Sequence, residues 1–151
     1  QYGLLASQSV LEHLQLQVGM DLRRVEDAAD VGTFNRDYDR YYATGTVSDV
    51  GSKGLSLSAT ADFWNSNGQL VRSLGASVDK TFDKLTASAG TYYSLYKFDL
   101  FSNSERDHVR TWFGKVKYKT GKDVTVDLDY ELEYDNIGRT HTVRMGVVWN
   151  F

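Results

Sequence analysis

A strict two-residue alternation between Asp123 and Tyr134 constrains the fold of this chain more than any other feature. Acidic or hydroxyl side chains occupy every odd position of this segment, and apolar or aromatic side chains occupy every even position. A helix would spread the carboxylates around its surface, whereas a β-strand places all of them on one face. The segment is therefore predicted to be an amphipathic strand.

The same alternation recurs along the chain and predicts eight strands. The connections between them are rich in Gly, Asn and Asp, which favour antiparallel hairpins, and proline is absent. The predicted apolar faces run over Leu14–Leu22, Tyr41–Val47, Leu55–Phe63, Leu74–Val78, Leu85–Leu95, Trp112–Tyr118, Val124–Tyr134 and His141–Phe151. At 151 residues, the whole chain is predicted to form one domain.

The remaining segments are predicted from local signals. Residues 1–12 are expected to form either a periplasmic tail or a short helix, because Ser9 and Glu12 have capping-box spacing. Two longer connections, Val25 to Asp37 and Asp99 to Asp107, fall on the same side of the up-and-down path. Membrane barrels have short periplasmic turns and longer outer loops, so this side is predicted to be extracellular and both termini periplasmic.

The distribution of charge suggests which face of the strands meets lipid. The apolar faces carry no charge in their central parts, and Arg72, Lys80, Lys97 and Arg110 share their parity only near strand ends. A charged Arg or Lys at the midplane of a lipid-facing strand costs roughly 2–4 kcal/mol, which explains such segregation. A soluble barrel with an apolar core is the alternative. Frequent Ala, Gly and Thr on the apolar face would fill such a core poorly.

The C-terminal residues carry a resemblance to a known family. The alternating side chains Met145, Val147, Trp149 and Phe151 are similar to the terminal strand signal that the barrel-assembly machinery reads in bacterial outer-membrane β-barrels. The resemblance implies a transmembrane antiparallel up-and-down β-barrel with a polar lumen and an apolar lipid face. It also implies location in the bacterial outer membrane, with lipid, lipopolysaccharide and the assembly machinery as partners.

The acidic row on the inward face has three interpretations. Clustered carboxylates bind Ca²⁺, but residues two apart on a strand are separated by about 6.6–6.8 Å, so one ion would need ligands from neighbouring strands. The row would alternatively attract cations along a lumen wall. The favoured interpretation is a salt-bridge network, because unpaired charges in a narrow lumen are costly. The predicted network comprises Asp123, Asp127, Asp129, Glu131, Glu133, Lys115, Lys117, Arg144, Arg40 and Arg23.

Other classes of function find little support in the sequence. The net charge is -3 and no stretch is strongly basic, which argues against nucleic acid as a partner. There are no cysteines, and parity keeps His13, His108 and His141 apart, so no metal site, cofactor or catalytic group is predicted. The chain is therefore not predicted to be an enzyme, although a barrel lipase, acyltransferase or protease stays open.

Barrel size separates two functional hypotheses. Eight strands that close on themselves leave an interior just wide enough for side chains. Such a plugged barrel would have a structural or surface-interaction role, carried by the extracellular loops. The alternative is a porin-like or conduit barrel, complete or formed by this chain as its C-terminal part, that moves ions or solutes or houses a partner protein.

Overall fold

A computed structural model describes residues 1–24, 37–66, 68–99, 104–121 and 124–149. These residues form strands and connections and contain no helix. The strands are β1 (Tyr2–Leu11), β2 (Leu14–Arg23), β3 (Tyr38–Ser48), β4 (Leu55–Ser66), β5 (Gln69–Thr81), β6 (Leu85–Asp99), β7 (Ser104–Lys119), β8 (Val124–Tyr134) and β9 (Arg139–Trp149).

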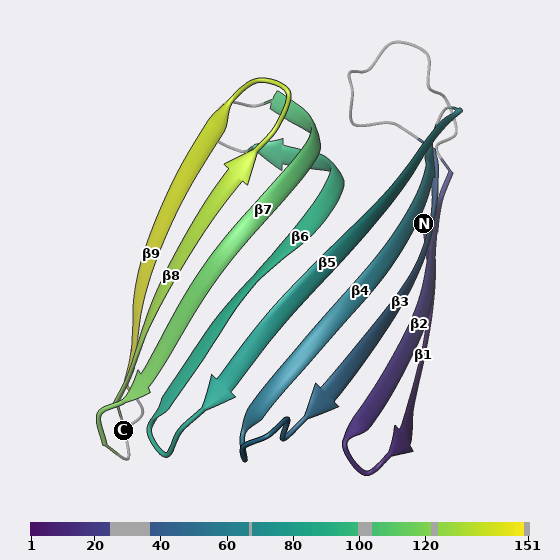
Figure 1. Cartoon of the computed structure of the whole chain (residues 1–151). Coiled ribbons are helices and arrows are strands. Elements are labelled where there is room, and N and C mark those ends of the chain that lie inside the picture. Colours follow the sequence, from purple (N-terminus) through teal and green to yellow (C-terminus); the bar gives the residue numbers. More distant parts are fainter. Residues whose placement is uncertain (25–36, 67, 100–103, 122–123, 150–151) are drawn as a thin grey trace.

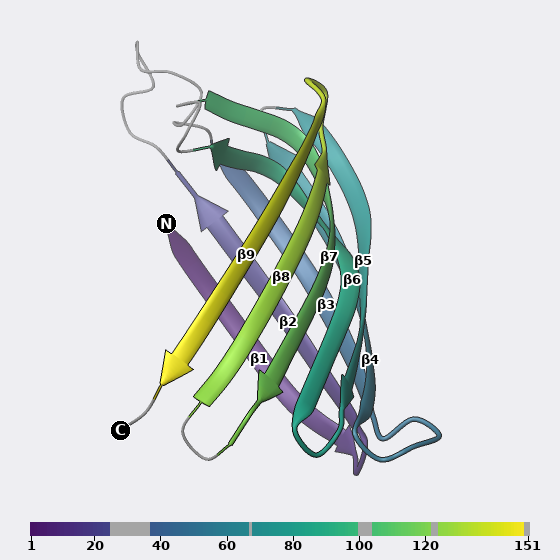
Figure 2. The ribbon, with the colours of Figure 1, turned by 90° about the vertical axis from the view of Figure 1, so that its left-hand side faces the viewer.

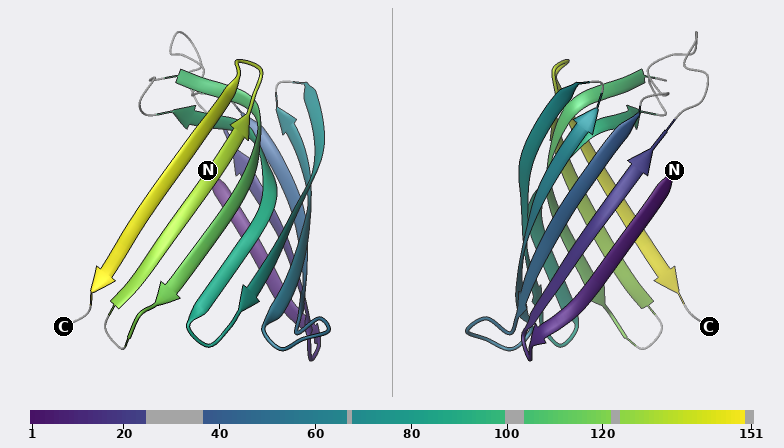
Figure 3. Two further views of the ribbon diagram at one scale, coloured as in Figure 1. Left: turned by 60° about the vertical axis from the view of Figure 1, so that its left-hand side comes forward. Right: turned by 90° about the vertical axis from the view of Figure 1, so that its right-hand side faces the viewer.

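The described strands build one antiparallel sheet in which each strand pairs with the next in sequence (Figure 1). This confirms the predicted all-β, up-and-down organisation, and β2 to β9 correspond to the eight predicted strands. The sheet curls strongly but does not close, because β1 and β9 each keep one edge without a strand partner among the described residues (Figures 2 and 3). Closure of the sheet into a barrel and its insertion into a membrane are therefore treated below as proposals.

The first strand corrects the prediction for residues 1–12. Residues 2–11 form β1 and are neither a tail nor a short helix. The pairing runs from Tyr2 opposite Leu22 to Leu11 opposite Leu14, around a turn at Glu12 and His13. Pairing with a neighbouring strand therefore outweighs the local capping-box spacing. The apolar doublets Leu4-Leu5 and Val10-Leu11 interrupt the alternation, which is why the sequence pattern did not indicate this strand.

The ninth strand changes where the two ends of the sheet lie. An even number of strands would place the start of the first and the end of the last at one rim. With nine, Tyr2 and Trp149 lie at opposite rims (Figure 2). The prediction that both termini are periplasmic depended on an even number.

The predicted connections coincide with most of the observed turns. Asp49 and Gly54, between β3 and β4, both have positive φ, and Gly54 N donates to Asp49 Oδ1 at 2.5 Å. The long connection predicted over Asp99–Asp107 is shorter, because pairing of β6 with β7 continues to Asp99 opposite Ser104. Most of the other long connection, residues 25–36, lies outside the described residues.

Burial in this sheet is inverted relative to a soluble protein. Leu74 and Met145, on the face with apolar side chains, are 71% and 75% exposed. The polar face is the concave one, and it holds most of the buried side chains. Among the described residues, the buried polar side chains are Asp62, Ser66, Arg106, Thr111, Glu131 and Glu133, and the buried hydrophobic ones are Trp64, Leu95 and Val109. No helix in the described part of the chain is long and apolar enough to cross a membrane.

Strands β6 and β7 bend together over the concave side near one rim (Figures 1 and 2). The bend coincides with His108, whose φ of 56° is unusual for a residue other than glycine. The pair between His108 and Leu95 is missing from the ladder, although pairing resumes beyond it. The register of β6 and β7 is the same on both sides of this irregularity, and beyond it Lys97 and Arg106 pair with Glu133 on β8.

Candidate functional site

The concave face carries groups of ion pairs, the first of which surrounds Arg40 on β3. The Arg40 guanidinium donates through Nε to Asp62 Oδ1 at 2.6 Å, and its Nη1 lies 3.6 Å from Asp21 Oδ2. The same guanidinium lies 4.5 Å from the ring centre of Tyr42 and 4.8 Å from that of Trp64. Paired carboxylates and two aromatic rings therefore fix the direction of its donors.

A second group, called here the bend cluster, ties the bent ends of β6 and β7 to β8. It consists of Lys97, Arg106, Glu133 and Asp135. Glu133 is 3% exposed and pairs with both Lys97 and Arg106. Arg106 Nη1 also donates to Asp135 Oδ2 at 3.0 Å and to Thr140 Oγ1 at 3.1 Å. Two carboxylates thus face two cations where the bend covers the concave side.

Asp135 follows β8 directly and connects the bend cluster to the turn before β9. Its Oδ1 accepts hydrogen bonds from the backbone N–H of Ile137 at 2.8 Å and of Gly138 at 2.7 Å. Burial raises the pKa of Asp135, but these two hydrogen bonds and the Arg106 guanidinium outweigh it and hold the pKa below its usual value. Asp135 therefore favours its charged form in the folded protein.

Part of the predicted charge network forms ion pairs along the acidic row of β8. Lys115 Nζ lies 3.7 Å from Asp129 Oδ2, and Arg144 Nη1 lies 3.3 Å from Glu131 Oε1. Both basic side chains are about half exposed, so these pairs are partly wet.

The other members of that network are distributed over the sheet and its edges. Lys117 is the register partner of Asp127. Arg40 pairs with acids that the prediction did not include, and Arg23 ends β2. Asp123 lies outside the described residues. The network is thus several local groups along one face rather than one connected row.

Several residues of these groups were missed by reasoning from the sequence. Parity placed Lys97 on the lipid face, but its ammonium pairs with the buried Glu133. Arg106 lay in a predicted loop. The sequence does not indicate the bend of β6 and β7 at His108, because the positive φ there is not marked by a Gly. Asp62 has the inward parity of β4, but the predicted network did not include it, although it pairs with Arg40.

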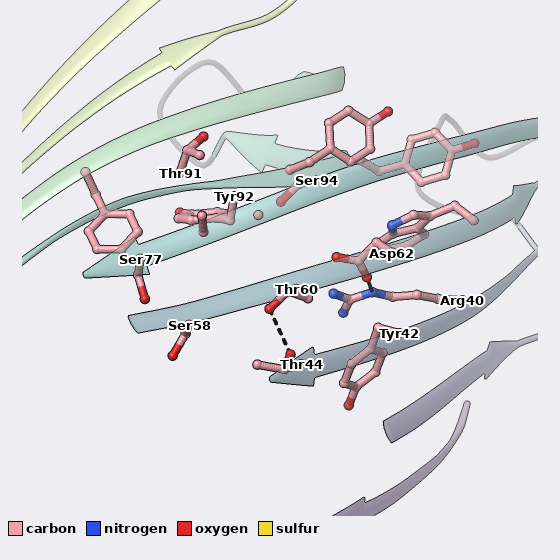
Figure 4. Close-up of a pocket in the computed structure, with 16 residues that line it drawn as sticks. Arg40, Tyr42, Thr44, Ser58, Thr60, Asp62, Ser77, Thr91, Tyr92 and Ser94 are labelled. Atoms are coloured by element: carbon pink, nitrogen blue, oxygen red, sulfur yellow. Dashed lines mark hydrogen bonds and ion pairs between the residues drawn. The ribbon is translucent and has the colours of Figure 1, made fainter. Parts of the chain in front are cut away.

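A cavity of about 460 Å³ opens on the concave face between β3 and β7 (Figure 4). It lies where β5 and β6 diverge, since their pairing stops at Ala76 opposite Thr91 while both strands continue. Its lining is largely hydroxyl and aromatic side chains, with Arg40 and Asp62 as the charged members. Thr44 and Thr60 join their hydroxyls at 2.8 Å across its floor.

The histidines show no catalytic arrangement in the described residues. His108 Nδ1 lies 2.6 Å from the Tyr93 hydroxyl, His141 Nδ1 lies 2.9 Å from the Tyr130 hydroxyl, and His13 is near Asp49. Each thus contacts a different part of the sheet. The described part of the chain also holds no group of three or more residues suited to bind a metal ion.

The described members of the predicted assembly signal lie on the exposed apolar face of β9, one of the two strands that keep an edge without a partner among the described residues. Met145, Val147 and Trp149 are all well exposed on this face. Phe151, the last member of the signal, lies outside the described residues.

Comparison with known proteins gave no relative. No protein-family model, no curated protein sequence and no solved structure matches the chain.

Proposed function

We propose that this chain forms part of the wall of a bacterial outer-membrane β-barrel, and that its concave face lines a water-filled path for small solutes. The observation that carries the proposal is the inverted burial of the sheet. The apolar face is exposed along its length, while buried Glu133, Glu131 and Asp62 lie on the concave face. An exposed apolar face of this extent is expected where the surrounding medium is lipid.

The arrangement of hydrogen bonds favours the same medium. A bilayer core offers no water to backbone N–H and C=O groups, so a spanning sheet must satisfy them between strands. Strands β2 to β9 are 10 to 16 residues long, enough for a tilted transmembrane strand, which needs about 9–11. Antiparallel pairing of consecutive strands satisfies the backbone over most of this length, except between β5 and β6 beyond the pair of Ala76 and Thr91.

The two free edges favour a barrel wider than eight strands. Nine consecutive antiparallel strands leave β1 and β9 running in the same direction (Figure 2). Direct closure would therefore join β1 and β9 in parallel, unlike every other pair in the sheet. An all-antiparallel barrel built on this sheet needs an odd number of further strands. A wider barrel leaves the concave face lined but not filled.

The charges of the concave face suit a hydrated path for small solutes. Both signs are present, and half-exposed Lys115 and Arg144 lie beside acidic partners. The resulting field favours neither strong cation nor strong anion selectivity. Lipid and lipopolysaccharide would contact the apolar face, and the assembly machinery would recognise β9. A surface-interaction role would depend on connections that lie largely outside the described residues.

Single-channel conductance of the complete barrel that contains this chain, refolded in a planar bilayer, tests the proposal. We expect stable current steps with weak ion selectivity. Asp129→Asn should shift selectivity towards anions, and Leu128→Gln, on the apolar face of the same strand, is the control that should leave selectivity unchanged. Protein that inserts but carries no current would contradict the proposed path, and protein that fails to insert would contradict the proposed wall.

A further inference from the structure

We propose that the cavity between β3 and β7 is a binding site for a neutral saccharide. The inference rests on the proposed function, because it names the class of solute that the concave face would meet. The cavity, of about 460 Å³, lies within the range of small-molecule sites, about 300–1,000 Å³. Figure 4 shows polar side chains from neighbouring strands that converge on it.

The first argument is the density of hydroxyl groups. The hydroxyls of Thr44 and Thr60 meet at 2.8 Å, and those of Thr46 and Ser58 meet at 2.9 Å. A hydroxyl both donates and accepts, so a wall of hydroxyls suits a ligand whose own groups also do both. A ligand that carries many hydroxyls on one small ring fits this requirement. The hydroxyl-bearing lining residues with concave parity are Tyr42, Thr44, Ser58, Thr60, Ser77, Tyr92, Ser94 and Tyr96.

The second argument is the apolar part of the same wall. The rings of Tyr92 and Phe113 lie with their centres 6.0 Å apart, and the Trp64 ring also lines the cavity. A sugar ring presents C–H groups on its faces and hydroxyls around its edge. Aromatic rings contact such a face, while the hydroxyl side chains contact the edge. This pairing of surfaces distinguishes a saccharide from a simple ion.

The third argument is a buried polar atom without a partner. Trp64 shares the concave parity of Thr60 and Asp62 and is 9% exposed, and its Nε1–H donates to no group within the described residues. Buried polar groups are rarely left without a hydrogen bond, so this N–H indicates a polar occupant.

The fourth argument concerns charge. Arg40 and Asp62 are the charged lining residues, and they neutralise one another across 2.6 Å. An anionic ligand would have to compete with Asp62 for the guanidinium, and a cationic one with Arg40 for the carboxylate. A neutral ligand instead accepts from the remaining guanidinium N–H groups and donates to the remaining carboxylate oxygen. The site therefore favours a saccharide without net charge.

Calorimetric titration of the complete barrel that contains this chain with maltose tests the proposal. The protein is refolded in lauryldimethylamine oxide, a detergent without a sugar headgroup, and its fold is checked by heat-modifiable gel mobility. We expect saturable binding of maltose. Trp64→Phe keeps an aromatic ring and removes the N–H, and Thr60→Val removes a hydroxyl of the cavity floor at similar volume. Each should weaken binding by about tenfold, as expected for one lost hydrogen bond.

The control is Trp112→Phe, on the exposed apolar face, which should change the affinity by less than about twofold. If Trp64→Phe does not fold, the affinity of Thr60→Val for maltose still tests the site. No saturable binding of maltose, unchanged affinity in the folded variants, or tighter binding of digalacturonate than of maltose would each overturn the proposal. Saturable binding of maltose without single-channel current would support the saccharide site and refute the proposed solute path. Single-channel current without binding of maltose would support the solute path and refute the site.

Discussion

The substitution Glu133→Gln tests whether the bend cluster holds the ends of β6 and β7 over the concave side. Gln keeps the size of the side chain and removes its charge. Glu133 is 3% exposed and the Arg106 side chain 8%, so the change leaves a buried guanidinium with one carboxylate fewer. Breaking a buried pair costs about 3–5 kcal/mol. Because Arg106 keeps Asp135 at 3.0 Å, we expect a loss near the lower limit, about 3 kcal/mol.

The matched control is Asp129→Asn on the same strand. Its partner Lys115 is 47% exposed and lies at 3.7 Å, so this pair should contribute only about 0.2–1 kcal/mol. Both free energies of unfolding can be measured by urea titration in lipid vesicles, with tryptophan fluorescence as the signal. Equal losses for the two variants, or a loss below 1 kcal/mol for Glu133→Gln, would refute the idea that the bend cluster is a buried structural element.

Three further outcomes are expected. Met145→Arg should prevent folding into vesicles, whereas Thr142→Arg on the concave face should fold, and heat-modifiable gel mobility compares them; equal behaviour would contradict the assignment of faces. Because its folded pKa is depressed, Asp135 should add stability that is complete above its unfolded pKa of about 3.9 and is lost as the pH falls through the folded value. The difference in unfolding free energy between the protein and Asp135→Asn should therefore shrink below pH about 4, and a constant difference would refute this. Deletion of Phe151 should lower the yield in the outer membrane of cells more than the stability of refolded protein, and an unchanged yield would contradict the assembly signal.

The regular strands could be predicted because their alternation is strict. In β8, every even residue from Val124 to Tyr134 is apolar or aromatic, and this pattern gives both the strand and its faces without knowledge of its neighbours. In β1 the pattern is interrupted by apolar doublets, and the strand is identified only by its pairing with β2. The local sequence pattern of a strand does not show which other strand it pairs with.

The candidate site could be predicted only in part. The inward position of Asp62 and Glu133 follows from parity. The reach of Lys97 to Glu133 does not, because it depends on a positive φ at His108, a residue that rarely adopts it. The cavity was not predictable either, since it depends on where β5 and β6 stop pairing.

The central claim is that the apolar face meets lipid and the concave face meets water. The chain has no native cysteine, so single substitutions place one reporter on either face. Val143→Cys and Thr142→Cys, adjacent on β9, can carry a polarity-sensitive fluorophore in vesicles. We predict that brominated lipid quenches the label at Val143 and that aqueous iodide quenches the label at Thr142. Quenching of both labels by iodide alone, or the reverse pairing, would contradict the account.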